Sequence, residues 1–443
     1  MRIKEIKIIN FKGFEKKTLV FPDRLTVVIG NNTAGKTTLL KAVQVGLGAF
    51  LQSMTFLPGG PAYRRNFSKA DTFMAFDDFN KTYIPNKEMP KIDVTALFPT
   101  GFSLEKHEVY GIKKRWYRQF KNTYTTHKRE CAGELIDAVH DMEDKRFGQN
   151  TETLFPLILS FGAKRTEDSQ VKTSARVNER ASRMEKAYKY ALHDKVDFKS
   201  VTEWLRHYDK DINDGKEFEG TREAFMEAMQ TAIPALSDIS FDKGEIEAVV
   251  TVTGHRPSRH HFSYMSDGLQ SMINIVSEIA YRCIQLNGFL GTDAVKMTPG
   301  VVLIDEVDLY LHPHWQKHVL QDLMNAFPQI QFIVSTHSPF IVQSLKEGQL
   351  ISFDDDVLTT GEPFREGLED ITSERMGLKQ NIRSRRFNKM VDTATRLFEA
   401  ADNGDADKDE IKAELDRIEA EFSDDPAYLA TIRLECKARN KRS

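Results

Sequence analysis

The chain has 443 residues, of which 40% are hydrophobic and 29% charged, a composition that is typical of a globular protein and excludes a disordered one. Its 62 basic and 65 acidic residues leave a formal charge of −3, so any contact with DNA must be a local patch rather than an effect of overall charge. The 3 cysteines form no CxxC pair, which argues against a disulfide framework or a zinc site. The N-terminus is charged and no apolar run approaches the about 18 residues that span a bilayer, so we expect a cytoplasmic protein without a membrane partner.

A glycine-bounded loop near the N-terminus lies between an apolar strand, predicted over Leu25–Ile29, and a helix that begins near Lys36. The loop matches G-x-x-x-x-G-K-[ST], a pattern in which backbone N–H groups and the helix N-terminus face phosphate oxygens. Lys36 would reach the β- and γ-phosphates of a nucleotide, and the Thr37 hydroxyl would ligate Mg²⁺. The predicted nucleotide contacts are Gly30, Asn31, Asn32, Ala34, Gly35, Lys36, Thr37 and Thr38.

Residues 91–130 predict antiparallel strands, and the second of these mixes basic and aromatic side chains. Lysines and arginines interleaved with aromatic rings over residues 113–121 could follow a DNA backbone. The alternative is an outer β-layer with one packed and one solvated face. Further along, an apolar run within residues 154–165 predicts a buried strand, and the charged, amphipathic segment that follows predicts a helical lobe.

The sequence Ser-Asp-Gly-Leu-Gln opens an apolar helix at residues 266–270. It could be an ordinary capped helix. Alternatively, the Ser266 hydroxyl and the Gly268 N–H lie at a helix N-terminus where they could receive a phosphate oxygen. The choice between these interpretations depends on the other motifs.

Two later strands end in polar residues. The apolar run Val301–Ile304 predicts a strand buried on both faces of a parallel sheet, and it ends in Asp305 and Glu306. Since ligands bind at the carboxyl ends of such strands, Asp305 would hold Mg²⁺ through water and Glu306 would polarise an attacking water. After a helix that opens at Pro313, the strand in "IQFIVSTH" brings His337 either to a γ-phosphate or to backbone partners.

Four blocks, in this order, resemble the ABC-type ATPases of the RecF/SMC/OLD branch: "IKIINFKGFEKKTLVF", "GNNTAGKTT", "MSDGLQS", and "LIDEVDLYLHP" with "STHSPF". The resemblance implies an α/β fold, an ABC-type P-loop ATPase with an antiparallel β layer, a helical lobe insertion and a helical C-terminal extension. It implies ATP and Mg²⁺ as cofactors. The expected domains are the two parts of the ATPase head, 1–165 and 241–350, the lobe, 166–240, and the extension, 351–443.

In that family two copies face each other head to tail, and the signature helix of one copy caps the γ-phosphate held by the other. The resemblance therefore implies a homodimer or higher homo-oligomer, with Asp308 and the Leu311-His312 pair in the loop that crosses the interface. Asp267 stands where the family most often has a second glycine, and Gln52 is a weak candidate for the family's Q-loop glutamine. The implied roles are catalysis for Glu306 and His337, Mg²⁺ ligation for Thr37 and Asp305, and contact with the partner's ATP for Ser266, Gly268 and Gln270.

The rest of the chain indicates which members of this ATPase branch the protein resembles. The segment between Gly30 and Ser266 is too short for a chromosome-tethering coiled coil and has no sustained heptad repeat. Past residue 350, carboxylates at 354–356 do not follow the order of the Toprim nuclease of OLD proteins. The last residues predict a helical hairpin with Ile411 and Leu415 on one stripe, either a docking module for another protein or a hairpin packed on its own ATPase.

An ATPase of this branch with short inserts and no nuclease of its own resembles PtuA, the ATPase subunit of Septu-type antiphage systems. That family works with a separate HNH nuclease, PtuB, so the resemblance implies a subunit that gates a PtuB-like partner. The alternatives are an OLD-like ATPase-nuclease acting alone and a RecF-like DNA-repair ATPase. A transporter ATPase is not favoured by the "LHP" and "STHSP" surroundings.

Overall fold

The computed structural model describes residues 1–86, 88–99, 110–121, 124–149, 152–163, 182–242, 245–251, 256–354 and 357–377, together with residues 413 and 417. The chain divides into two compact units, Met1–Ile371 and Thr372–Ser443. The first unit contains every predicted nucleotide contact, whereas the apolar residues of the predicted C-terminal hairpin lie outside the described residues. No helix in the described part of the chain is both long and apolar enough to cross a membrane.

A five-stranded parallel sheet forms the centre of the first unit, in the order β15-β3-β14-β13-β9. The strands are β3 (Leu25–Ile29), β9 (Leu157–Phe161), β13 (Gly300–Ile304), β14 (Ile330–Ser335) and β15 (Leu350–Ser352). All residues of β3, β9, β13 and β14 are buried, which explains why these segments are apolar runs without alternation. The predicted phosphate loop, acid pair and His337 each follow one of these strands, so the parallel arrangement brings them to the same edge of the sheet.

Strand β15 crosses the boundary predicted between the head, 241–350, and the mainly helical extension, 351–443. The three residues pair in parallel with β3, in the register Leu350 to Val27 and Ser352 to Ile29. A strand this short has no periodicity of its own, and only its pairing with β3 defines it.

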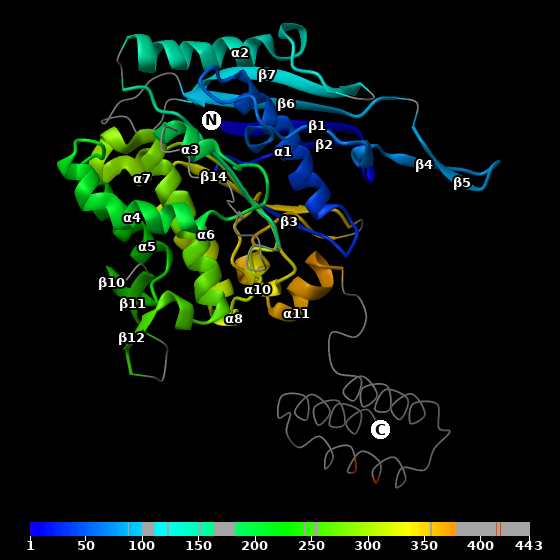
Figure 1. Ribbon diagram of the computed structural model, residues 1–443. Helices are drawn as coiled ribbons and strands as arrows, with labels where there is room; N and C mark the ends of the chain where they lie inside the picture. The colour runs from blue at the N-terminus through cyan, green and yellow to red at the C-terminus, as the bar shows by residue number, and fades with distance from the viewer. Residues whose placement is uncertain are drawn as a thin grey trace. The chain divides into compact units, whose positions relative to one another are not determined.

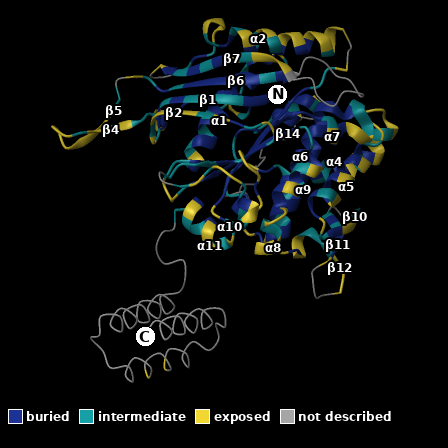
Figure 2. Ribbon diagram, turned by 180° about the vertical axis from the view of Figure 1, so that it is seen from behind, coloured by how far each residue is buried: buried dark blue, intermediate teal, exposed yellow. Residues whose placement is uncertain are grey.

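An antiparallel layer has the order β2-β1-β6-β7-β8. Its strands are β1 (Arg2–Phe11), β2 (Phe14–Val20), β6 (Lys91–Pro99), β7 (Tyr110–Lys121) and β8 (Tyr124–Thr125), which confirms the antiparallel strands predicted within residues 91–130. Helix α2 (Arg129–Glu143) packs against β7, and a hairpin of β4 (Met74–Asp77) and β5 (Thr82–Pro85) projects to one side (Figure 1). Exposed residues gather on α2 and this hairpin, whereas the central strands are buried (Figure 2).

Helix α1 (Lys36–Ser53) begins directly after the phosphate loop and lies between the antiparallel layer and the parallel sheet. It contacts β1, β6 and β7 on one side and β14 on the other. Because a sheet faces it on both sides, the helix needs no polar face, and its residues are buried along most of its length. The helix that begins at the phosphate loop is therefore packed between two sheets.

Helices α3 (Arg183–Tyr188), α4 (Phe198–Asn213), α5 (Thr221–Ala232) and α7 (Ala294–Met297) pack around α6 (Asp267–Asn287). Strands β10 (Leu236–Asp242), β11 (Glu245–Val250) and β12 (Ser258–His261) form a separate antiparallel sheet. The single helix predicted after Pro313 is two helices, because His318 has φ −119° and interrupts the helical backbone. The remaining helices are α8 (Pro313–Gln316), α9 (Val319–Ala326), α10 (Pro339–Gln343) and α11 (Leu368–Asp370).

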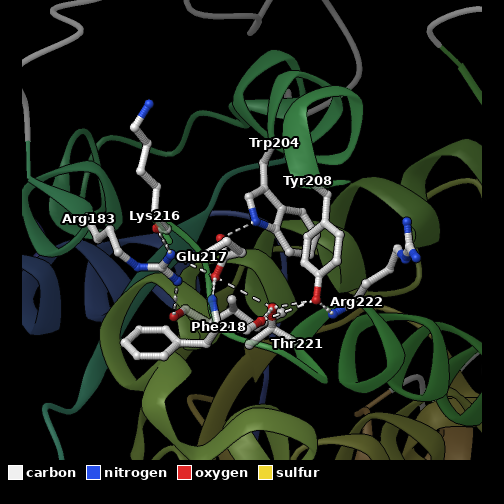
Figure 3. Close-up of polar contacts among 9 residues, drawn as sticks. Arg183, Trp204, Tyr208, Lys216, Glu217, Phe218, Thr221 and Arg222 are labelled. Carbon is white, nitrogen blue, oxygen red and sulfur yellow. Dashed lines mark hydrogen bonds and ion pairs between the residues drawn. The ribbon is translucent and has the colours of Figure 1, made fainter. Parts of the chain in front are cut away.

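A polar network fixes the connection between α4 and α5 (Figure 3). The Glu217 carboxylate, 3% exposed, accepts a hydrogen bond from Trp204 Nε1 at 2.7 Å and pairs with Arg183 at 2.7 Å. Arg183 also donates to the Ile284 carbonyl of α6 at 3.1 Å. Since Glu217 is buried but fully partnered, the network joins the lobe to α6 without leaving an uncompensated charge.

Candidate nucleotide site

The phosphate loop connects β3 to α1, and the end of β13 lies beside it. The hydroxyl of Thr37, in the first turn of α1, donates a hydrogen bond to Asp305 Oδ2 at 2.8 Å. The structure thus brings together two residues that the sequence separates by most of the head and that are the predicted Mg²⁺ ligands. Hydroxyl and carboxylate oxygens are the ligands that Mg²⁺ prefers, so the donor set fits this ion.

The loop is shaped by Gly35, which precedes α1 with a φ of 108°. A Cβ at this position would lie 2.6 Å from Cζ of Phe14, so both the backbone conformation and the close ring require glycine. Lys36 is buried, and its ammonium donates to the carbonyl oxygens of Gly30 at 2.6 Å and Asn31 at 3.1 Å. Burial lowers the pKa of Lys36, while the charges of surrounding carboxylates, of which Asp354 contributes most, oppose that decrease. The ammonium is held over the loop by acceptors that a phosphate can replace.

A serine at the end of the neighbouring strand forms hydrogen bonds with both residues of the acid pair. Ser335, the last residue of β14, donates its hydroxyl hydrogen to Asp305 Oδ1 and accepts the Glu306 N–H at 2.8 Å. Glu306 has a φ of 49°, an uncommon backbone conformation for a non-glycine residue and one found at functional sites. One serine therefore orients both acidic residues.

The two loops that follow β13 and β14 are joined by side chains. Thr336 donates to Asp308, and Ser338 donates to Gln316 Oε1 at 2.7 Å. His337 lies between these two anchors and is exposed. It projects from a fixed backbone at the same sheet edge as the acid pair, and its predicted role at a γ-phosphate remains a prediction.

The signature residues begin α6, as the sequence predicts. Ser266 is exposed and its hydroxyl accepts the Leu269 N–H at 3.5 Å, which makes it the N-cap. Gln270 Nε2 donates to the Met265 carbonyl at 2.9 Å. Gly268 is buried, and a Cβ there would lie 2.5 Å from the Tyr310 carbonyl oxygen. The glycine thus permits a close approach between the signature helix and the loop after the acid pair in the same chain.

The sequence did not predict that residues after β15 contact the phosphate loop. Strand β15 delivers Asp354 to the phosphate loop, where its Oδ1 accepts the Asn31 N–H at 3.0 Å. The preceding Phe353 ring packs edge-on against Phe14, with 5.4 Å between centroids. In the sequence, Asp354 is only one of the carboxylates at 354–356 that bear on the OLD-like alternative. Its contact with the phosphate loop favours a role in the nucleotide site instead. Residues 355–356 lie outside the described residues.

Two other predictions are corrected. Gln52 is wrong as a nucleotide contact, because it lies about 24 Å along α1 from Lys36 and its Oε1 accepts from Arg118 at 2.9 Å. Arg118 is wrong as a DNA contact, because it is fully buried and also donates to the Val45 carbonyl at 3.0 Å. Trp116 is buried with it, so one face of β7 is packed, as in an outer β-layer. Lys113, Arg115 and Lys121 are exposed, and DNA contact through them stays a prediction.

Comparison with known proteins shows which families and proteins this chain is similar to. Residues 5–232 match the family described as an AAA domain, and residues 145–343 match "AAA domain, putative AbiEii toxin, Type IV TA system". The retron Vc95 probable ATPase of Vibrio cholerae serotype O1 biovar El Tor is 23% identical over 400 residues, 79% of this chain and 73% of that protein. The Septu protein PtuA of Bacillus mycoides (strain KBAB4) is 29% identical over 191 residues, 41% of this chain and 26% of that protein. The SMC head domain from Thermotoga maritima has a TM-score of 0.40 and 15% identity, covering 80% of this chain and 94% of that chain.

Proposed function

Since the chain belongs to the family described as an AAA domain, we propose that it binds ATP with Mg²⁺ and hydrolyses it at the edge of the parallel sheet. The observation that carries the proposal is the contact between Thr37 and Asp305, which pairs the phosphate loop with the acid pair. Lys36 would bind the phosphates, and Glu306 would accept a proton from the attacking water. Bound Mg²⁺ would neutralise phosphate charge between Thr37 and Asp305.

The test uses two variants with different expected failures. Lys36→Ala removes the ammonium and should abolish binding of a fluorescent ATP analogue. Glu306→Gln keeps the shape of the side chain but not its basicity, so nucleotide binding should persist while turnover falls by about 10²-fold or more. Lys113→Ala, on the exposed side of β7, is the matched control and should behave as the unmodified chain. Hydrolysis that survives in Lys36→Ala would contradict the proposal.

The second element of the proposal is a head-to-tail homodimer. Its support is the N-terminus of α6, where Ser266 and Asp267 are exposed and Gln270 is half-buried, while most of the helix is buried. A phosphate held by a second copy would approach Ser266 and the first N–H groups of α6. The His337 of the copy that holds the nucleotide would contact the same phosphate. Light scattering on Glu306→Gln should show the mass doubling when ATP and Mg²⁺ are added. A mass that does not change on adding nucleotide would refute the dimer.

The third element is control of a separate DNA nuclease in antiphage defence, with an HNH nuclease as partner. Its support is the similarity to retron ATPases along most of the chain and to PtuA along 41% of it. The purified chain with Mg²⁺ and ATP should leave plasmid DNA intact. Adding a PtuB-like HNH nuclease should give cleavage that depends on nucleotide and is lost with Lys36→Ala. Cleavage by the chain alone would instead support the OLD-like alternative.

A further inference from the structure

A half-buried carboxyl group, that of Asp194, lies between α1 and β9. Asp194 Oδ1 accepts hydrogen bonds from Gln44 Nε2 and from the Ser160 hydroxyl, both at 2.6 Å, and Gln44 Nε2 also contacts Ser160 Oγ at 2.8 Å. Burial raises the pKa of Asp194, the hydrogen bond from Ser160 opposes this, and the charge of Asp305 adds to it. The remaining charged groups that act on this carboxyl group are Lys41 and Arg65.

Asp194 joins the two elements that carry the proposed metal ligands. Gln44 lies on α1, about 10 Å along the axis from Thr37. Ser160 lies on β9, which pairs directly with β13, and the Asp305 N–H donates to the Phe161 carbonyl at 2.8 Å. One carboxylate oxygen therefore holds the helix of Thr37 against the strand beside Asp305. The contact between Thr37 and Asp305 joins the same helix to the end of β13, the strand that pairs with β9.

The segment that carries Asp194 is held in an unusual backbone conformation. Tyr190 and Asp194 both have a φ of 56°, in the left-handed region that side chains disfavour. Such conformations persist only where the surroundings impose them. Here the Tyr190 N–H donates to the Ala62 carbonyl and the Ser160 N–H donates to the Ala191 carbonyl, each at 2.8 Å. The backbone around Asp194 is thus fixed to the head.

The same segment is attached to the signature helix. Arg282 of α6 donates to the carbonyl oxygens of Ala187 and of Lys189, the latter at 3.0 Å. Glu278, one turn earlier on α6, accepts the Asp197 N–H at 2.9 Å and pairs with Arg282 at 2.7 Å. Residues 187–197 consequently contact α6 at both ends and, through Asp194, the helix α1 and the strand β9.

We propose that Asp194 is a positioning residue for ATP hydrolysis, which sets the spacing between Thr37 and Asp305 and makes it depend on the position of α6. The inference rests on the proposed function. If binding of a second copy at the N-terminus of α6 displaces this helix, the movement is passed to Asp194 through residues 187–197. Asp194 itself does not contact the reacting atoms.

The test compares Asp194→Ala, which removes the shared acceptor, with Asp194→Asn, which removes the charge but keeps an oxygen at the Oδ1 position. Glu143→Gln is the matched control, because the Glu143 carboxylate is also a hydrogen-bond acceptor shielded from solvent and accepts the Thr55 N–H at 2.8 Å just beyond the other end of α1. The readouts are the Mg²⁺ concentration for half-maximal binding of a fluorescent ATP analogue, kcat and KM for ATP, and the melting temperature without nucleotide.

For Asp194→Ala we expect the Mg²⁺ requirement to rise and kcat to fall by about 10-fold to 100-fold each, the range seen when groups that orient metal ligands are removed. Asp194→Asn should stay within roughly threefold of the unmodified chain, because both donors keep their acceptor. Glu143→Gln should lower the melting temperature without changing the Mg²⁺ requirement. Ser160→Ala, a smaller change, should shift the Mg²⁺ requirement in the same direction and replaces Asp194→Ala if that variant does not fold.

An unchanged Mg²⁺ requirement in both Asp194→Ala and Ser160→Ala would overturn the inference, as would an equal change in Glu143→Gln, which would indicate general destabilisation. Failure of the proposed function looks different. In that case the unmodified chain would not bind Mg²⁺ and ATP, or Lys36→Ala would bind them equally well.

Discussion

Replacing Gly268 by alanine tests the packing between the signature helix and the loop that carries Glu306. The added Cβ would lie 2.5 Å from the Tyr310 carbonyl oxygen, whereas carbon and oxygen atoms in close contact lie about 3.3–3.6 Å apart. The backbones must therefore separate by about 1 Å. Neither backbone moves easily, because most residues of α6 from Gly268 onward are buried and Tyr310 has a φ of 65°. Overpacking of this kind costs about 1–3 kcal/mol, which lowers the melting temperature of a unit of this size by roughly 1–4 °C.

The same displacement reaches Glu306, four residues before Tyr310. We expect kcat for ATP to fall by about 10²-fold, as a 1 Å misplacement can cause, while binding of an ATP analogue to the phosphate loop persists. The assays are steady-state hydrolysis, analogue binding and thermal unfolding without nucleotide. Gly60→Ala is the control, since a Cβ at Gly60 meets no atom within 4 Å. Unchanged melting temperature and unchanged kcat in Gly268→Ala would refute the close contact. A loss of kcat alone would assign Gly268 a role only toward a second copy.

Three further predictions concern buried polar groups. Arg118→Ala leaves several buried acceptors without a donor, so urea denaturation should show a loss of about 3–5 kcal/mol, and DNA affinity should not change. Glu217→Ala removes the partner of Arg183 and of the Trp204 N–H, and should cost about 1–3 kcal/mol in the same assay. Burial lowers the pKa of His127 to about 4, so the unfolded chain binds a proton between about pH 6.5 and 4 that the folded chain does not. Stability should fall with acidification across this window, and less steeply in His127→Gln.

The phosphate loop and the acid strand could be predicted from sequence because their chemistry is local. Gly35, Lys36 and Thr37 must be adjacent to form the loop, and a buried parallel strand is apolar at every position, as Val301–Ile304 is. The groups that orient these residues could not be predicted. The Ser335 hydroxyl that contacts both acidic residues lies on a different strand, and a serine at a strand end has no distinguishing pattern. Asp194 is defined only by its contact with Gln44 and Ser160 across the fold.

The interleaved segment at residues 113–121 shows why composition alone was ambiguous. A strand alternates its side chains between two faces, so basic and aromatic residues interleave whether the strand binds DNA or covers a core. Trp116 and Arg118 face inward because the carbonyl oxygens of Gly46 and Val45 on α1 accept their N–H groups, at 2.9 and 3.0 Å. A buried arginine requires such acceptors. They are present because α1 packs against β7, and this packing cannot be predicted from the sequence of β7 alone.

Asp354 links the phosphate loop to a strand more than three hundred residues later, and its charge should be measurable through Lys36. Among the carboxylates whose charge opposes the decrease in the pKa of Lys36 on burial, Asp354 makes the largest contribution. Asp354→Asn retains an acceptor for the Asn31 N–H but removes that charge, so the pKa of Lys36 should decrease. Affinity for an ATP analogue should then be lost at a lower pH on the alkaline side than in the unmodified chain, whereas Asp78→Asn, in the exposed turn of the β4–β5 hairpin, should leave the profile unchanged. Identical alkaline limbs in Asp354→Asn and the unmodified chain would mean that β15 supports the loop by hydrogen bonding alone.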